Sequence, residues 1–553
     1  MALTEALAET ATDSVRNVLF IMCDQLRWDA LSCSGHSPID TPNIDRLAER
    51  GLRYDRAFVQ GAVCGSSRAS YYTGRYVQSH GVRWNGVPTQ LNQMTLGDHL
   101  APLDVRTVLI GKTHMGGDVS AMKRMGVDPN SPEWVFASEC GFEPEERHDG
   151  LYPDIPRFKD LPYNQFLRDN GFEGDNPWHT AANSVLDDDE KLLSGWLLRS
   201  SGYPTIVPDE LSETAFMTNR AIEFMSKAGD DQWCVHLSFI KPHWPYVASD
   251  PYHQMFADVE LPAANRSDHE LVDPHPVLDA FQKSRIGQTF SRDDVRSLVY
   301  PAYLGLVKQI DDHLGRLFAE MERMGRLDDT MIVFCSDHGD YMGDHWMGDK
   351  DWLHEEAVRT PMIIVDPRPA ADAQRGTISS ELVEAIDLVP TFLEALGGDV
   401  EAAHPWLEGE SLQPSLHGMG HVARTAVVCE TDFGFLEMAN RLDLGDKRER
   451  RATMLRSDRY KYILSEIGPD LLYDLDEDPG ELVDRIDDPG LATVRADMHE
   501  QLFDWFRHRK HDPTYPDSFI DRCSQPGGTA QRGIMIGYWD EEDLERGLAG
   551  DLP

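Results

Sequence analysis

The sequence predicts an α/β fold, with a large, mostly parallel sheet covered by helices on both faces. Two observations predict it. Apolar, β-branched runs alternate with helical patterns through the first 424 residues of the 553-residue chain, which is typical of a parallel sheet. Beyond them, short strand patterns separated by turns indicate a smaller C-terminal α+β subdomain with a short antiparallel sheet. We therefore assign residues 1–424 to an α/β domain, 425–510 to the subdomain and 511–553 to a tail.

The first strand and the first helix carry the clearest signals. The run NVLFIMCDQ, residues 17–25, is typical of a buried parallel strand. The helix over 41–51 has Thr41 as its cap, Pro42 in its first turn and Gly51 at its end. Further strands are predicted at 106–114, 233–243, 330–339 and 360–367, and further helices at 209–229 and 301–325.

The C-terminal subdomain is predicted from strand-rich segments at 424–435, 451–466 and 470–484, followed by a helix over 491–510. The tail has little helix or strand pattern, but it contains the apolar cluster GIMIGYW at 533–539. An exposed cluster of this kind needs a partner surface. We expect the tail to pack on a second subunit, which would make the protein a homo-oligomer, either a dimer or a tetramer.

Composition excludes several classes of partner. The formal net charge of −43 disfavours nucleic acids and anionic membranes, because both bind basic surfaces. No apolar run reaches the roughly 18 residues of a membrane span. The start, MALTEALAETATDSVRN, lacks the features of a secretory signal, so we expect a cytoplasmic protein. The eight cysteines show no CxxC spacing, and neither a disulfide framework nor a zinc cluster is predicted.

Polar residues gather where the predicted strands end, and ligands of open α/β sheets bind beyond the carboxyl ends of strands. The four pairs are Asp24 and Gln25, Lys112 and His114, Lys241 and His243, and Asp337 and His338. The first and last pairs offer oxygens and an imidazole that suit a hard or borderline divalent cation. Lys112, His114 and His243, together with Arg68, offer the local positive charge that an anionic substrate of so acidic a chain requires.

The segment GAVCGSSRAS, residues 61–70, places Cys64 four residues before Arg68 at the start of a helical pattern. Two interpretations are open. Cys64 is either a buried cysteine at a loop-to-helix junction, or a nucleophile or its precursor at a positive helix N-terminus beside a guanidinium. The spacing alone does not decide between them.

Eight segments carry a family resemblance, in the family's order: FIMCDQLRWDAL, TPNIDRLAERG, AVCGSSRAS, IGKTHMG, KPHWPY, FCSDHGDYMGDHWMGDK, IDLVPTFLEALG, and RSDRYKYI with LLYDLDEDPGE. They cover about residues 15–485. On these segments the chain resembles the type I sulfatase and phosphonate monoester hydrolase branch of the alkaline phosphatase superfamily.

The resemblance implies that Cys64 is oxidised to formylglycine by a formylglycine-generating enzyme. One hydroxyl of the aldehyde hydrate would attack sulfur or phosphorus in line and form a covalent ester. Loss of the proton from the second hydroxyl would then expel sulfate and restore the aldehyde. The implied ligands of one divalent ion, Mn²⁺ or Ca²⁺, are Asp24, Gln25, the modified Cys64, Asp337 and His338.

The resemblance also implies roles for the cationic residues. Arg68 and Lys112 match the residues that hold the hydrate and its developing charge, and His114 matches the base that triggers collapse of the ester. His243 and Lys350 match the groups that contact the transferred oxygens and protonate the leaving group.

Three features separate this chain from the commonest family pattern. Ser66 stands where the maturation motif usually has Pro or Ala. The Asp-Gln and Asp-His pairs are similar to those of phosphonate monoester hydrolases and choline sulfatases, whereas GKTHMG is similar to sulfatases. Asn85 lies where the phosphonate hydrolases have a substrate-contacting Asn. The insertion over 118–208, which would form the leaving-group wall, carries no interpretable motif.

We therefore expect a formylglycine-dependent arylsulfatase or alkyl sulfatase that hydrolyses small anionic sulfate monoesters, with side activity on phosphonate monoesters and phosphodiesters. Two alternatives stay open. One is a phosphonate monoester hydrolase or phosphodiesterase that uses the same site. The other is an unprocessed, non-catalytic anion-binding protein in which Cys64 remains a thiol.

Overall fold

The computed structural model describes residues 15–35, 38–128, 131–150, 161–403, 405–420, 424–435, 450–509, 545–546 and 549. Its centre is an eight-stranded sheet in the order β10-β2-β9-β8-β1-β7-β3-β4. The strands are β1 (Asn17–Asp24), β2 (Leu52–Phe58), β3 (Arg106–Gly111), β4 (Glu143–Arg147), β7 (Trp233–Pro242), β8 (Thr330–Ser336), β9 (Arg359–Val365) and β10 (Thr377–Glu384). β9 runs antiparallel to β8 and β2, and the other neighbours pair in parallel. The predicted fold class is confirmed.

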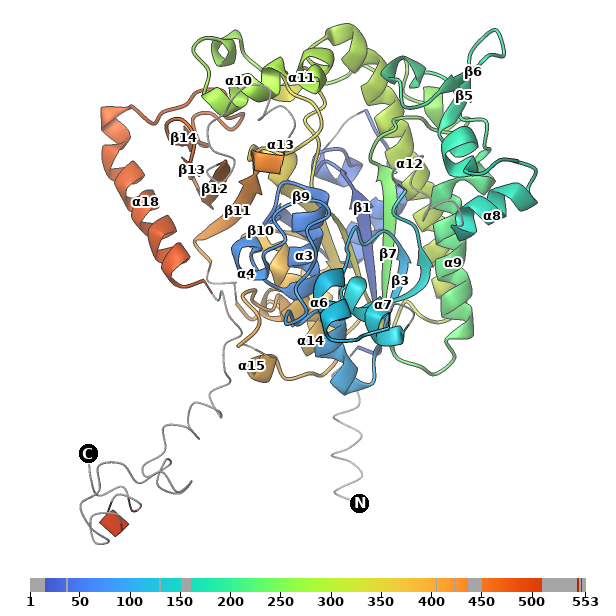
Figure 1. The fold of residues 1–553 in the computed structure, drawn as a ribbon, viewed down its shortest axis with the longest axis horizontal. Helices are drawn as coiled ribbons and strands as arrows, with labels where there is room; N and C mark the ends of the chain where they lie inside the picture. The colour runs from blue at the N-terminus through green and yellow to red at the C-terminus, as the bar shows by residue number, and fades with distance from the viewer. Residues whose placement is uncertain are drawn as a thin grey trace.

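Both faces of this sheet are buried, as the unbroken apolar run of β1 requires. Val18, Phe20 and Met22 belong to one hydrophobic cluster, and the alternate residues Leu19 and Ile21 belong to the other. Helices α2 (Pro42–Arg50), α9 (Glu213–Lys227) and α12 (Asp293–Arg323) contribute to the second cluster. Helices α3 (Cys64–Thr73), α5 (Leu96–Leu100) and α14 (Leu388–Ala395) contribute to the first. Figure 1 shows these two layers on opposite sides of the strands.

Shorter helices and strands lie outside the central sheet and its main helices. The helices are α4 (Val77–His80), α6 (Val119–Arg124), α7 (Pro132–Ser138), α8 (Pro162–Asp169), α10 (Pro276–Lys283), α11 (Arg285–Phe290), α13 (Glu355–Val358), α15 (Val400–Ala403) and α16 (Gln413–Leu416). A two-stranded sheet of β5 (Ser184–Leu186) and β6 (Leu192–Ser194) lies within the insertion whose sequence gave no motif.

The predicted start of α2 is confirmed, with Thr41 at the N-cap position and Pro42 in the first turn, whereas the predicted start of α12 needs correction. Thr41 occupies the position before α2, but its hydroxyl makes no capping bond to the helix and instead pairs with the Ser32 hydroxyl at 2.7 Å. Helix α12 begins at Asp293 and contains Pro301, whereas the sequence interpretation began the helix at this proline. Proline is common in a first turn, which explains the misplacement, yet here it lies in the interior of a long helix.

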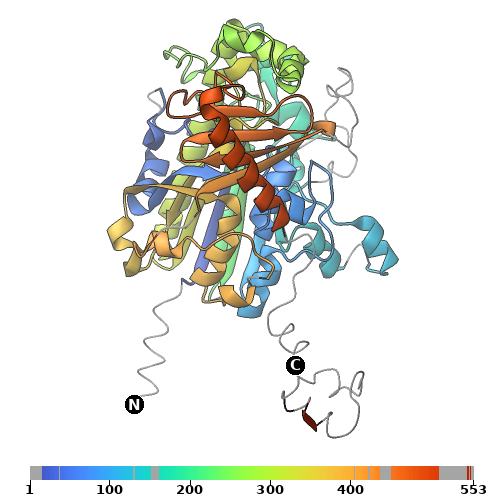
Figure 2. The same ribbon diagram turned by 90° about the vertical axis from the view of Figure 1, so that its left-hand side faces the viewer.

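The C-terminal subdomain has the predicted architecture (Figure 2). Its antiparallel sheet consists of β11 (Ala426–Asp432), β12 (Arg451–Ser457), β13 (Tyr460–Ser465) and β14 (Leu471–Asp474), followed by α18 (Ala492–Arg507). Val428 and Leu455 form a cluster with Leu502 of α18. Cys429 and Met454, on the opposite face, join a core cluster of the α/β domain. The apolar tail cluster at 533–539, with its expected oligomer contact, lies outside the described residues.

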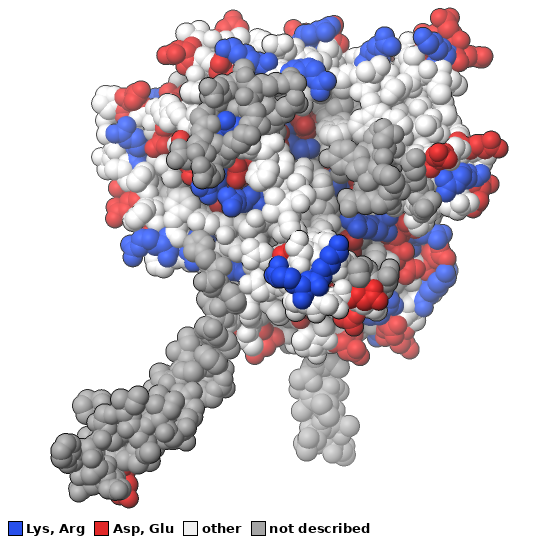
Figure 3. Space-filling model, viewed as in Figure 1, with Lys and Arg blue, Asp and Glu red and all other residues white. Residues whose placement is uncertain are grey.

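Four neighbouring parallel strands, β8, β1, β7 and β3, carry the polar pairs predicted from the sequence. Their carboxyl ends therefore meet at one edge of the sheet. Acidic and basic side chains are interspersed on the face shown in Figure 3, so the acidic excess forms no single patch there. Among the described residues, none of the helices combines the length and apolarity that crossing a bilayer requires.

Candidate active site

Cys64 is the first residue of α3, and the extended backbone of Val63 precedes it (φ −134°, ψ 152°). The next residue is held by a loop from elsewhere in the chain, because the Gly65 N–H donates to Asn85 Oδ1 at 2.7 Å. A Cβ added to Gly65 would lie 2.9 Å from that oxygen and 3.2 Å from the Trp84 carbonyl oxygen. Glycine after Cys64 thus lets the loop approach the start of the helix.

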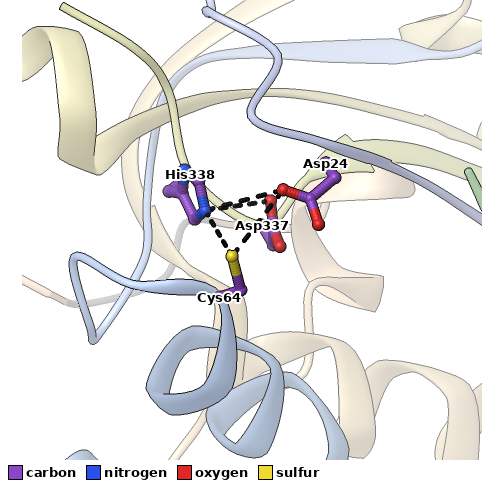
Figure 4. Close-up of side chains that lie close together, drawn as sticks. All are labelled: Asp24, Cys64, Asp337 and His338. Atoms are coloured by element: carbon purple, nitrogen blue, oxygen red, sulfur yellow. Dashed lines mark hydrogen bonds and ion pairs between the residues drawn. The ribbon is translucent and has the colours of Figure 1, made fainter. Parts of the chain in front are cut away.

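Three buried side chains, those of Asp24, Asp337 and His338, converge around the Cys64 sulfur (Figure 4). Its Sγ lies 3.1 Å from His338 Nε2 and 3.7 Å from Asp24 Oδ1, and His338 Nε2 lies 3.7 Å from Asp337 Oδ1. The donor atoms of these four residues all lie within 4.8 Å of one another. His338 Nδ1 faces the Gly339 carbonyl oxygen at 2.9 Å, so it carries the proton and the Nε2 lone pair points into the cluster. Two carboxylates, an imidazole lone pair and a sulfur position fit a divalent cation.

Arg68 organises the two carboxylates. Its Nε donates to Asp337 Oδ2 at 2.7 Å, and a terminal nitrogen lies 3.2 Å from Asp24 Oδ2. The remaining contacts of the guanidinium include the Lys112 carbonyl oxygen and Ser238 Oγ, both at 2.8 Å. The Lys112 ammonium also pairs with Asp24. Both cations are fully buried, and their ion pairs with Asp24 and Asp337 offset the cost of burying these charges.

We call Asp24, Cys64, Asp337 and His338 the metal-type cluster. Gln25 links this cluster to Lys350. Its backbone N–H donates to Asp337 Oδ1 at 3.0 Å, and its Oε1 accepts from Lys350 Nζ at 3.0 Å. The side-chain amide also donates to Asp340 Oδ2 at 2.5 Å. Gln25 has a left-handed backbone, with φ 67°, which turns the chain sharply at the end of β1. Metal binding by Gln25 stays a prediction.

His243 and Lys350 form a second polar pair. Lys350 Nζ lies 3.3 Å from His243 Nε2, and His243 Nδ1 faces the Trp244 carbonyl oxygen at 2.8 Å. Burial and the Lys350 charge hold the pKa of His243 well below its usual value. Burial alone would lower the pKa of Lys350, but Asp349 and other negative groups raise it well above the usual value. Lys350 is therefore the protonated partner and His243 the neutral one. Lys241, also predicted near this pair, donates to the Pro245 carbonyl oxygen at 2.8 Å.

His114 is half-buried at the end of the β3 loop, with a left-handed backbone (φ 58°). Its backbone N–H donates to Asp149 Oδ1 at 3.1 Å, and its Nδ1 has no hydrogen-bond partner among the described residues. Burial and the neighbouring Lys112 charge lower the pKa of His114 to about 3. The imidazole is neutral at pH 7 and able to accept a proton.

The cysteine is a weak nucleophile as encoded. Burial and, second, the negative charge of Asp24 raise the pKa of the Cys64 thiol to about 12, although Lys350 and Lys112 oppose this. Burial, helped by Asp24, thus keeps Cys64 a neutral thiol at pH 7, and the thiolate is the nucleophilic form.

Comparison with known proteins identifies the family. Residues 16–398 match the family model described as Sulfatase. The chain belongs to the sulfatase family. Residues 343–508 also match the model described as N-sulphoglucosamine sulphohydrolase, C-terminal. The resemblance to the sulfatase branch of the alkaline phosphatase superfamily is therefore confirmed.

Relatives within and around the sulfatase family align along most of the chain. One is the multifunctional alkaline phosphatase superfamily protein PehA of Trinickia caryophylli, 29% identical over 89% of this chain and 95% of that protein. The arylsulfatase of Clostridium perfringens is 27% identical over 89% of this chain and 92% of its own. The solved phosphonate monoester hydrolase of Agrobacterium radiobacter has a TM-score of 0.75 at 28% identity, covering 88% of this chain and 95% of its own.

The structure of this sulfatase family member brings all the predicted site residues to one edge of the sheet, and it adds three. Asp340 accepts from Tyr246 at 2.6 Å and from Gln25, and Ser238 supports Arg68. Asp340 lies in FCSDHGDYMGDHWMGDK, one of the segments that carry the family resemblance. This segment contains several aspartates, and the sequence does not show which of them faces the site. Ser238 lies inside β7, where an inward serine looks like any small core residue.

Proposed function

We propose that the chain hydrolyses sulfate monoesters of the aryl type, with formylglycine made from Cys64 as nucleophile and one divalent metal ion. The observation that carries the proposal is the position of Cys64, whose sulfur lies within the buried donor cluster and within the electrostatic reach of Lys112 and Lys350. An oxygen nucleophile at this position would face both a metal and two cations. A reaction that moves an anionic group requires this arrangement of charge.

The donor cluster fits a hard or borderline divalent cation, and its imidazole favours Mn²⁺ over Ca²⁺, which prefers oxygen ligands alone. When bound there, the cation would polarise an ester oxygen and favour the deprotonated nucleophile. The chain's own residues prepare this site. Arg68 fixes the orientation of both carboxylates, and Lys112 balances the charge of Asp24.

The proposed roles of His114, His243 and Lys350 follow from which of these side chains carry a proton and which can accept one. His114 is neutral and its Nδ1 is unpartnered among the described residues, which suits the base that takes the proton of the second hydroxyl. His243 donates from Nδ1 to a carbonyl oxygen, so its neutral Nε2 accepts from Lys350. Lys350 is then the group that holds a proton toward the leaving oxygen. Asn85 positions the start of α3 as well as lying near the substrate.

A second candidate is hydrolysis of phosphonate monoesters or phosphodiesters in the same site. The likeness to the solved phosphonate monoester hydrolase along 88% of the chain favours it. Lys112 and His114, which resemble sulfatase residues, favour the first. Small anionic esters are the proposed substrates in both cases.

Maturation and assembly complete the proposal. A formylglycine-generating enzyme would be a transient partner, acting on a motif with Ser66 at its third position. We also propose a cytoplasmic homo-oligomer held by the tail, residues 511–553. Removal of the tail should then lower the number of subunits per particle, determined from the mass measured by light scattering, and an unchanged number of subunits would contradict this assembly.

The proposed conversion of Cys64 and the proposed substrate preference can both be tested on a single preparation of the protein. Mass spectrometry of the peptide containing Cys64 measures the aldehyde fraction after co-expression with a formylglycine-generating enzyme, and Ser66→Ala supplies the more usual motif as a comparison. We expect aldehyde in the wild type, and higher kcat/KM for 4-nitrophenyl sulfate than for 4-nitrophenyl phenylphosphonate. The opposite preference would favour the second candidate. A fully thiol protein that binds sulfate without turnover would favour the anion-binding alternative.

A further inference from the structure

Two tryptophans meet beside the Lys350–His243 pair. The Trp244 ring lies 4.2 Å, centroid to centroid, from the His243 ring, and Lys350 Nζ lies 5.7 Å from the Trp244 centroid. Trp196, just after β6, meets Trp244 at 5.4 Å with an interplanar angle of 61°. Both tryptophans are half-buried, so each leaves part of its ring open. We call Trp196 and Trp244 the aromatic corner.

The orientation of both rings is fixed by the protein. Trp244 Nε1 donates to Asp349 Oδ1 at 3.4 Å, and Trp196 Nε1 donates to His179 Nδ1 at 2.9 Å. Trp196 also packs edge-on against the buried Trp178 at 6.1 Å. Since the indole N–H groups are directed at protein acceptors, the surface left open is the apolar part of each ring. The corner is therefore preorganised for contact with an apolar ligand.

We propose that the aromatic corner is the leaving-group subsite, and that it selects esters whose leaving group is a neutral aromatic ring. This rests on the proposed function, in which Lys350 holds a proton toward the leaving oxygen. Whatever is bonded to that oxygen must start beside Lys350 and His243, and Trp244 is in contact with both. An aromatic ring there can stack on one indole and meet the edge of the other.

The charges beside the corner argue against a cationic leaving group, which aromatic rings also bind. The Lys350 ammonium already lies within cation–π distance of the Trp244 ring. Asp349, the carboxylate that accepts from Trp244 Nε1, is paired with Lys350 at 3.1 Å. A second cation at this ring would be repelled by the first and would find the carboxylate engaged.

The subsite also explains what the insertion contributes. Trp196 and His179 both belong to the stretch over 118–208 that carries no sequence motif, and they supply one wall of the corner. Trp244 belongs to KPHWPY, the segment at and just beyond the end of β7 that also supplies His243. The catalytic framework and the variable insertion thus meet at the point where the leaving group departs.

The test compares Trp196→Ala and Trp196→Phe with wild type on 4-nitrophenyl sulfate, 2,2,2-trifluoroethyl sulfate and choline sulfate, at known aldehyde content. Trp196→Ala should lower kcat/KM for the aryl ester roughly tenfold, mainly through KM, because a ring contact is lost. It should change the aliphatic and cationic esters less than twofold. Trp196→Phe, which keeps a ring, should recover most of the loss. Phe503→Ala, an exposed aromatic on α18, is the control and should change nothing.

Equal losses on all three esters, or the largest loss on choline sulfate, would overturn the aromatic subsite. Binding of benzenesulfonate and methanesulfonate, measured by calorimetry, separates this outcome from failure of the proposed function, because neither compound is an ester. If no sulfate ester is turned over, benzenesulfonate should still bind more tightly than methanesulfonate to wild type and lose that advantage in Trp196→Ala. Equal binding of the two to wild type would contradict the subsite.

Discussion

At the scale of single residues, the metal-type cluster is the part that the sequence predicted best. Asp24, Asp337 and His338 follow strands whose apolar runs are easily recognised, and parallel strands bring their ends together. The sequence could not show that Arg68 bonds both carboxylates, or that Gln25 faces Lys350, because those contacts depend on side-chain direction. Ser238 and Tyr246 were missed for the same reason.

Asp337→Asn tests the cluster. The change removes a charge that Arg68 holds at 2.7 Å and that faces His338, so metal affinity and kcat/KM should fall together, by roughly 10- to 100-fold. Metal content by elemental analysis and steady-state rates provide the measurement. Asp279→Asn, a surface carboxylate paired with Lys283, is the control. Full metal occupancy at a normal rate would remove Asp337 from the ligand set.

The pH profile tests His114. Burial and Lys112 lower its pKa to about 3, so the imidazole stays neutral and able to accept a proton throughout the range above that value. The kcat/KM profile at saturating metal should therefore show no acid limb near 6.5, the usual value for histidine. A limb near that pH that disappears in His114→Gln would contradict the assignment.

At the scale of elements, strands buried on both faces were predicted and edge strands were not. β10 and β4 carry few buried residues, TISSELVE and EPEER, so they give no apolar run. β2 alternates at its start, with Leu52 and Tyr54 buried, but it follows α2 directly after Gly51 and no turn separates them. The segment after β8 was recognised by its motif, yet its backbone was not foreseen. Met342, His345, Trp346, Asp349 and Asp351 all have positive φ, which is costly for residues with side chains.

Gly65→Ala tests how the start of α3 is held. The new Cβ would meet Asn85 and the Trp84 carbonyl, so either the loop or Cys64 must shift. A displacement near 1 Å should lower kcat on the order of 100-fold, with an unchanged far-UV circular dichroism spectrum. Gly116→Ala is the control, because no atom lies within 4 Å of its added Cβ. Wild-type rates in Gly65→Ala would show that this contact does not set the nucleophile's position.

At the scale of the whole molecule, the C-terminal sheet is joined to the α/β domain through a shared core and a buried ion network. Lys461 of β13 is fully buried, pairs with Glu355 at 3.1 Å and Glu481 at 2.6 Å, and donates to the Leu353 carbonyl oxygen at 3.1 Å. Leu353 lies three residues after Lys350. The sequence predicted the subdomain as a unit, but it could not show which strand face joins the larger core, since both faces are apolar.

Lys461→Met tests this coupling. Removing the cation leaves the buried Glu481 without the partner of its ion pair with Lys461, whereas Glu355 keeps Arg456 at 3.3 Å. Loss of the buried cation should cost about 3–5 kcal/mol of unfolding free energy. It should also lower kcat, because the Lys350 loop loses its anchor. Thermal unfolding and steady-state kinetics measure the two effects, and Lys227→Met, a surface residue paired with Glu223, is the control. Loss of stability with normal kcat would mean that the subdomain does not position the loop.

The burial of Cys64 limits the stage of biosynthesis at which this residue is accessible to another protein. Only 1% of this residue is exposed in the folded protein, and its sulfur lies behind the same buried groups that would later bind the metal. In the proposed maturation, the formylglycine-generating enzyme would therefore have to reach Cys64 before residues 61–70 are folded into the protein. The anchor of the Lys350 loop, made by Lys461 of β13 with Glu481, is synthesised still later, because Glu481 follows Cys64 by more than four hundred residues. If the proposed conversion takes place, the time between synthesis of Cys64 and folding of the site is the period in which it can occur, and faster folding should leave a larger unconverted fraction.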